Sequence, residues 1–457
     1  SDFDFEQALS HEMSQLEDLS LAEELNSLLP AKPIVARRIS IEHHTLRYFK
    51  TFYVDEKNLS TISKDRDHPR VCYLLRDNSL PQKTFLKETM ELSNRSIVAV
   101  IDTSEGLGSS IRELSSLRNI LSSYPEIQSD SIAKKEILDQ IDFFEEKVQA
   151  ILKDTLNSNL SSWFWQKKEQ PIDSSKSLQA LLSTVIGRDY FTKSPKVANE
   201  LINRDLISGQ GQSARRKLIQ AMLNDQEKPE LGFDKEHFPP DKSIFYALFL
   251  KHQLCEISSN RTRFIYPEKN SEFFEVYEAI KETLLKVDEP VSFKELQEKM
   301  SDSPFGIKQG LHPLVFMAFY LCHQQEMAIY EDGQFRPYLD TESLERFIRT
   351  KTNTFSFELY DSKEQTGIID FYSDTSIVKD KKSITSLQAA KNLTKFMNSL
   401  PDYVRFTDLG LSEQAKTFRA TFFSSKSPQD LFNKDIPRVL GYDTLKPKDK
   451  TKFNKSL

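Results

Sequence analysis

The residues best suited to chemistry form one cluster, SGQGQSARRKLIQAM, at 208–222. Two glycines precede Arg215, Arg216 and Lys217, and these three cations fall on the first turns of a predicted helix. Because a helix N-terminus presents unpaired N–H groups and a partial positive charge, a phosphate is a suitable guest there. The alternative is a solvated basic face that pairs with neighbouring carboxylates. The cluster predicts contact with nucleic acid or with an acidic partner.

Two further cations, Lys308 and Arg336, belong to a segment at 291–339. A short helix, a Gly/Pro-marked turn, a long apolar helix and two short strands joined at Glu331-Asp332-Gly333 make a winged-helix pattern. Lys308 lies on the turn before the long helix and Arg336 lies in the wing. That helix, LVFMAFYLCHQQ, is almost wholly apolar, and a helix that is apolar all round is buried. The pattern therefore favours a structural or protein-contact unit over a DNA reader.

Motifs that carry a complete reaction are missing from the sequence. It has no GxxxxGK[ST] phosphate loop, no HExxH, no GxSxG and no Cys/His ligand spacing, so neither a catalytic residue nor a metal ligand is predicted. Gly106 and Gly108 are interpreted as a strand-to-helix turn, because their spacing fails GxGxxG. His43 and His44, adjacent on a predicted strand, would point to opposite faces and would not share a metal.

An enzyme nevertheless stays among the alternatives, with a site assembled from distant residues of an N-terminal α/β domain. The concentrated polar feature of that domain is a group of three arginines near its first predicted strand, Arg37, Arg38 and Arg47. The same arginines are equally typical of a solvated sheet edge. The sequence leaves open whether the chain is an enzyme.

Composition describes an ordinary globular protein of several domains. The chain has 457 residues, of which 28% are charged, 38% are hydrophobic and only 12 are glycine. A net charge of -6 argues against a protein whose main task is to coat nucleic acid. No apolar run approaches the roughly 20 residues that cross a bilayer, and the acidic start is not a signal peptide. With three scattered cysteines, Cys72, Cys255 and Cys322, we expect a cytoplasmic protein.

Hydrophobic periodicity predicts a mainly α protein that also contains a small α/β domain, a helical hairpin, tandem winged-helix-like units and a C-terminal helical domain. The expected boundaries are 1–32 for an N-terminal helical segment, 33–108 for the α/β domain, 109–160 for the hairpin, 161–270 for a helical or first winged-helix-like domain, 271–360 for the second winged-helix domain, and 361–457 for the C-terminal helical domain and tail.

The hairpin has apolar residues at helical spacing on both sides of Pro125. It is interpreted as a spacer, with self-association through its apolar seam as the alternative. The aromatic run Trp163, Phe164 and Trp165 follows it, and we expect these side chains to seal the hairpin against the next domain.

Four segments together resemble the C-terminal half of large bacterial P-loop ATPases associated with anti-phage defence, of the BREX and related types. They are VARRISIEHHTLRYFKTFYVD, NELINRDLISGQGQSARRKLIQAM, PFGIKQGLHPLVFMAFYL and MNSLPDYVRFTDLGLSEQAKTFR. The resemblance extends over about 33–440 and rests on pattern rather than on a catalytic signature.

The resemblance implies that an ATPase module with Walker motifs precedes this piece, so that the chain is a fragment of a longer protein. ATP and Mg²⁺ would belong to that module, and no cofactor is expected in this chain. The chain itself would be a non-catalytic scaffold that docks other defence-system proteins, with DNA as a second candidate partner. The alternative is a free-standing winged-helix DNA-binding regulator.

Overall fold

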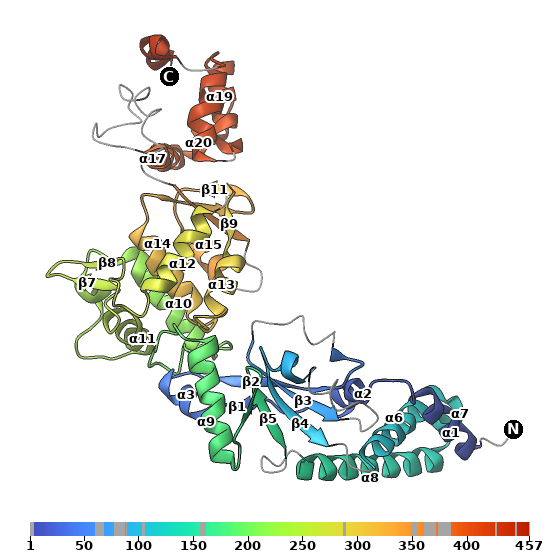
Figure 1. Cartoon of the computed structure of the whole chain (residues 1–457). Coiled ribbons are helices and arrows are strands. Elements are labelled where there is room, and N and C mark those ends of the chain that lie inside the picture. The colour runs from blue at the N-terminus through green and yellow to red at the C-terminus, as the bar shows by residue number, and fades with distance from the viewer. Residues whose placement is uncertain are drawn as a thin grey trace. The chain divides into compact units, whose positions relative to one another are not determined.

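The computed structural model describes residues 4–59, 68–76, 87, 89–102, 106–155, 161–286, 289–349, 354–360, 372, 385–425, 427–443 and 446–456. Two compact units divide the chain, Ser1–Thr192 and Lys193–Leu457. Figure 1 shows the first unit in blue to green and the second in green to red.

The first unit is built on a six-stranded sheet with strands in sequence order. Its strands are β1 (Ile34–Val35), β2 (Tyr48–Val54), β3 (Arg70–Arg76), β4 (Ile97–Asp102), β5 (Ser162–Trp165) and β6 (Lys168–Gln170). The central strands β2, β3 and β4 are parallel, and the other neighbours pair antiparallel. Alternate residues of β3 enter separate cores, Val71 and Tyr73 in one and Cys72 and Leu74 in the other. Burial of both faces explains the continuous apolar run of this strand.

Helices before, between and after these strands share a core with one face of the sheet. They are α1 (Phe5–Gln15), α2 (Leu21–Leu28), α3 (Arg37–Glu42), α6 (Leu107–Ser123), α7 (Pro125–Ser129), α8 (Ser131–Thr155), α9 (Ser175–Val185) and η1 (Ile186–Tyr190). The helices expected on either side of Pro125 are present as α6 and α8. Leu114 and Leu117 of α6 share a core with Ile137 and Ile141 of α8, and Figure 1 shows the two helices side by side.

The second unit gathers helices and short strands around one large core. Its elements up to residue 359 are α10 (Gly209–Asn224), η2 (Pro229–Gly232), α11 (Pro240–Phe245), η3 (Tyr246–Leu250), β7 (Cys255–Ile257), β8 (Thr262–Phe264), α12 (Phe274–Leu285), β9 (Val291–Ser292), α13 (Phe293–Ser301), α14 (His312–Cys322), β10 (Met327–Glu331), β11 (Gln334–Arg336), α15 (Thr341–Ile348) and β12 (Phe355–Leu359). Helix α14 lies at the centre of this core, and every residue from His312 to Leu321 is buried. The burial expected from its apolar sequence is therefore confirmed.

The sheet beside α14 has four strands, whereas the sequence predicted two. Strands β10 and β11 form the expected hairpin around Asp332 and Gly333, both of which have positive φ. The strand order is β11-β10-β12-β9, so β12 lies between the hairpin and β9. All three pairings are antiparallel. The hairpin thus does not contact β9 directly, because a strand from after α15 occupies that place.

The C-terminal part of the second unit is helical. Its elements are α17 (Ser386–Ser399), α18 (Asp402–Phe406), α19 (Glu413–Ser424), α20 (Pro428–Asp430), η6 (Leu431–Asp435), α21 (Ile436–Val439), η7 (Pro447–Asp449) and α22 (Lys450–Ser456). Its core joins α17 to the later helices through Leu393, Met397, Phe432 and Phe453. Between residues 361 and 384, Tyr372 alone belongs to the described residues.

The structure corrects the expected fold class. Of the described residues, 55% are helical and 13% lie in strands, and the largest sheet has six strands. The chain is therefore a mixed α/β protein, and the expectation of a mainly α protein with a small α/β domain is wrong. The sheet is larger than expected because β5 and β6 return to it after α8. Trp163 pairs with Ala99 of β4, in a strand where only an aromatic seal was expected.

A second correction concerns His43 and His44. They lie at the end of α3 and not on a strand, and His44 has a φ of 52°. A helix therefore precedes β2 where the sequence indicated a longer extended run.

Gly310→Ala is expected to destabilise the second unit. A methyl group at Gly310 would overlap the Ile202 carbonyl oxygen and lie 2.8 Å from the Arg204 carbonyl oxygen. Backbone atoms do not yield easily, and overpacking of this kind costs about 1–3 kcal/mol or more. Urea unfolding measures the loss. Gly209→Ala is the control, because its Cβ would meet no atom within 4 Å. A Gly310→Ala protein within about 0.5 kcal/mol of wild type would contradict the close approach.

Candidate functional site

The candidate site begins at the N-terminus of α10. Ser208 caps this helix, since its Oγ accepts a hydrogen bond from the Gly211 N–H at 3.2 Å. The N–H of Gly209, the first helical residue, has no acceptor among the described residues, as expected for the first turn of a helix. A helix of 16 residues thus directs an open, positively polarised end at its surroundings.

A pocket of about 580 Å³ adjoins this helix end. Its wall is contributed by the segment before α10, the first turns of α10, Gln309, and the end of α15. Three of the side chains are arginines, two are carboxylates, and several are apolar or neutral. The lining residues are Asp205, Leu206, Ile207, Gly209, Gln212, Ser213, Arg215, Arg216, Gln309, Glu345, Ile348 and Arg349.

Arg215 is the least ordinary of these residues. Its exposed fraction is 7%, and its Nη1 donates to the Gly310 carbonyl oxygen at 3.3 Å. Its Nε is buried and has no hydrogen-bond partner among the described residues, and no described carboxylate forms an ion pair with it. Burial lowers the pKa of the guanidinium to about 10, so the group is charged at neutral pH. A buried cation that pairs with no described carboxylate lines the pocket.

The other predicted cations of α10 differ from Arg215. Arg216 is partly exposed and lies 3.7 Å from Glu345 Oε1, which is a loose ion pair across the pocket wall. Lys217 is exposed and does not line the pocket. The cluster read from the sequence therefore divides into one buried arginine, one rim arginine and one solvated lysine.

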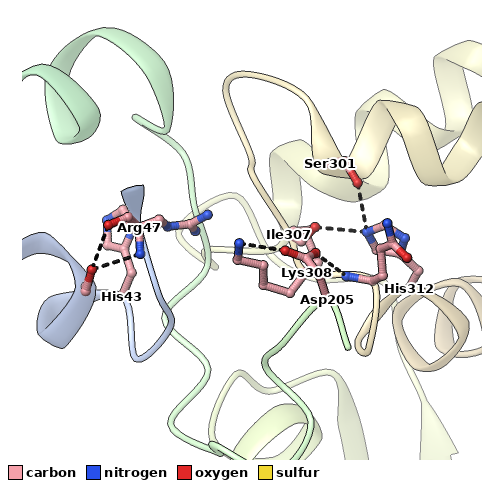
Figure 2. Close-up of polar contacts among 9 residues, drawn as sticks. His43, Arg47, Asp205, Ser301, Ile307, Lys308 and His312 are labelled. Carbon is pink, nitrogen blue, oxygen red and sulfur yellow. Dashed lines mark hydrogen bonds and ion pairs between the residues drawn. The ribbon is translucent and has the colours of Figure 1, made fainter. Parts of the chain in front are cut away.

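Lys308 does not line the pocket, but it contacts the lining residue Asp205. Its Nζ donates to Asp205 Oδ2 at 2.9 Å, and the Gln309 N–H donates to Asp205 Oδ1 at 3.2 Å. Figure 2 shows the Lys308 side chain directed at Asp205. Burial alone would raise the pKa of the Asp205 carboxyl, but the Lys308 ammonium and the Gln309 N–H outweigh it and hold that pKa below its usual value. Asp205 therefore holds Lys308 and Gln309 in place, and the positive charge of Lys308 balances its negative charge.

Arg336 lies away from the pocket, in β11. Its Nε is 3.2 Å from Glu331 Oε2, and Arg346 also pairs with the Glu331 carboxylate. Glu331 is only 3% exposed, so it needs these cations as partners. The structure thus brings Arg215 and Arg216 together, places Lys308 beside them, and separates Lys217 and Arg336 from the lining.

The residue that sequence reasoning missed is Arg349. It follows α15, lines the pocket, is exposed, and forms no ion pair with a described residue. Nothing in the local sequence RFIRT indicates this role, because the approach of α15 to α10 is a tertiary contact.

The three arginines noted in the first unit do not converge. Arg47 is buried, donates from Nε to His43 Nδ1 at 3.2 Å, and lies over the Phe191 ring at 4.6 Å. Arg37 and Arg38 are exposed on α3. This arrangement fits packing of β1 and α3 better than a shared site.

Other reactive groups are buried or scattered. Burial raises the pKa of Cys72 to about 11 and those of Cys255 and Cys322 to about 12. In the part of the chain that is described, His, Cys, Asp and Glu side chains do not gather into a group of three suited to a metal ion. Among the described helices, none combines the length and the apolar character that crossing a membrane requires.

Comparisons with protein-family models, with curated proteins and with solved structures find no match. Function is therefore argued from the site.

His312 gives the second unit a pH dependence. The ring is fully buried, and its Nε2 donates to the Ile307 carbonyl oxygen at 2.9 Å, as Figure 2 shows. Burial lowers the pKa of His312 to about 4. An unfolded chain binds this proton near pH 6.5, so the stability is complete above pH 6.5 and falls as the pH approaches 4.

We expect wild type to lose about 2 kcal/mol more stability than His312→Gln between pH 7 and pH 5. Urea unfolding at the two pH values measures the difference, and the shared contributions of all other groups cancel in it. Equal losses in the two proteins would contradict a neutral, buried His312.

Proposed function

We propose that this chain is a non-catalytic docking region whose second unit holds an anionic group of its partner in the α10 pocket. The sequence resemblance suggests the setting, a defence-associated ATPase of the cytoplasm whose other components are the partners. The three unpaired cysteines are consistent with that compartment.

The observation that carries the proposal is the state of Arg215. A buried guanidinium without a carboxylate is costly, and folded proteins normally satisfy such donors. Here the group has one bond, to the Gly310 carbonyl, and an unused Nε beside a pocket that Arg216 and Arg349 also line. An anion held in the pocket would balance the charge of this guanidinium, which pairs with no described carboxylate.

A binding role fits this pocket better than a catalytic one. Its two carboxylates are both engaged with cations, Asp205 with Lys308 and Glu345 with Arg216. Arginine does not lose its proton under ordinary conditions, so the remaining charged groups are poor general bases. The pocket is equipped to hold an anion rather than to transfer a proton.

The alternative, a winged-helix regulator that reads duplex DNA, has less support. Helix α14 is buried over its length, whereas a recognition helix presents side chains to base edges. Arg336, the wing candidate, is already paired with Glu331.

Sulfate or inorganic phosphate is expected to raise the melting temperature of the wild-type protein, and Arg349→Ala should weaken this binding roughly tenfold. Lys217→Ala is the matched control, since it removes one positive charge from α10 outside the pocket lining. Thermal unfolding across a range of anion concentrations measures both.

Arg215→Met separates a binding role from a structural one. If Arg215 serves a ligand, the variant loses its response to anions yet stays folded in anion-free buffer, because removal of a costly buried charge offsets the loss of the hydrogen bond to the Gly310 carbonyl, which is worth about 1.5–3 kcal/mol. Equal anion responses in wild type, Arg349→Ala and Arg215→Met would refute the proposed site. Specific duplex binding that is lost in Arg336→Ala alone would favour the regulator.

A further inference from the structure

We infer that the ligand of the α10 pocket is an organic phosphate of nucleotide size, bound with its phosphate at Arg215 and its remainder against Leu206 and Ile348. This inference rests on the proposed anion-binding function and names the chemical class of the anion.

The phosphate end is defined by groups from two separate segments. Arg215 and the open N-terminus of α10 come from one, and Arg349 after α15 comes from the other. Arg215 adds a feature that is independent of the helix end, because it is 93% buried (7% exposed), lines the same pocket, and forms no ion pair with a described carboxylate. A guanidinium presents its donors as a planar fork that matches two oxygens of a phosphate.

The charge of the site matches a phosphate monoester better than a carboxylate. Arg215, Arg216, Arg349 and the bracing Lys308 bring four positive charges, and Asp205 and Glu345 bring two negative ones, which leaves a surplus of two. A phosphate monoester carries about -1.5 to -2 at neutral pH, whereas one carboxylate carries a single charge.

The pocket is too large for a bare phosphate. Its volume of about 580 Å³ lies within the range of roughly 300–1,000 Å³ that is typical of organic-ligand sites. Part of its wall is apolar, from Leu206, Ile207 and Ile348. Leu206 lines the pocket and is 83% exposed, so its side chain is accessible to a bound ring or sugar.

Neutral polar groups complete the wall. Ser213 and Gln309 line the same cavity, and hydroxyl and amide side chains both donate and accept hydrogen bonds. A nucleobase or sugar offers both kinds of partner, which a simple fatty phosphate does not. A nucleoside monophosphate therefore fits the whole wall.

Two sources supply this chemistry, a free nucleotide and the phosphorylated end of a nucleic-acid strand. Isothermal titration of the 457-residue chain with AMP, inorganic phosphate, a short 5′-phosphorylated DNA strand and the same strand with a 5′-hydroxyl separates them. Tightest binding of AMP assigns the free nucleotide. Tightest binding of the phosphorylated strand, with loss on removal of its phosphate, assigns the strand end. Either result supports the organic phosphate.

Leu206→Ser tests the apolar contact, with Leu409→Ser as the matched control. Both leucines are exposed, at 83% and 89%, so neither change should disturb folding, and Leu409 is not in the pocket. We expect AMP to bind at least about tenfold more tightly than inorganic phosphate, and Leu206→Ser to remove most of that advantage while leaving phosphate binding unchanged. Leu409→Ser should leave both affinities at the wild-type value.

Three outcomes would overturn the inference in different ways. Equal affinities for AMP and inorganic phosphate, with no effect of Leu206→Ser, would leave an anion site and reject the organic phosphate. Binding of a glutamate-rich peptide in preference to every phosphate would assign the pocket to an acidic protein. Absence of binding to any of these anions would reject the proposed function itself.

Discussion

The second unit depends on the close approach of two chain segments at Gly310. The Gly310 N–H donates to the Arg204 carbonyl oxygen at 2.9 Å, and the Gly310 carbonyl accepts from Arg215 Nη1 at 3.3 Å. A few residues away, Lys308 and the Gln309 N–H hold Asp205. This set of bonds closes the segment before α10 against the turn before α14. Gly310 permits this approach, because a Cβ there would overlap the Ile202 carbonyl oxygen.

Burying Arg215 in this way is unfavourable for the fold, and the surrounding core offsets it. Helix α14 alone contributes ten consecutive buried residues, His312 to Leu321, and aromatic rings pack closely around it. Burial of so much apolar area stabilises the unit enough to tolerate a costly buried charge. Proteins commonly accept such a cost where a group serves a ligand rather than the fold.

The cations between residues 308 and 346 show how one residue type divides between two tasks. Arg336 and Arg346 neutralise Glu331, and Lys308 neutralises Asp205. Because a buried carboxylate without a partner is costly, these cations serve the structure first. Arg215 differs from these cations, because it lines the pocket and forms no ion pair with a described carboxylate. The role of a basic residue therefore depends on which carboxylates pack against it in the folded chain.

The sequence by itself determined the helices at α6, α8 and α10, the burial of α14 and the turn at Gly333, because periodicity, caps and positive φ are local properties. Tertiary structure decided the rest. The addition of β5 to the first sheet, the pairing of Lys308 with Asp205 across 103 residues, and the arrival of Arg349 at α10 all join distant parts of the chain. Such contacts follow from how whole elements pack, and no local pattern records them.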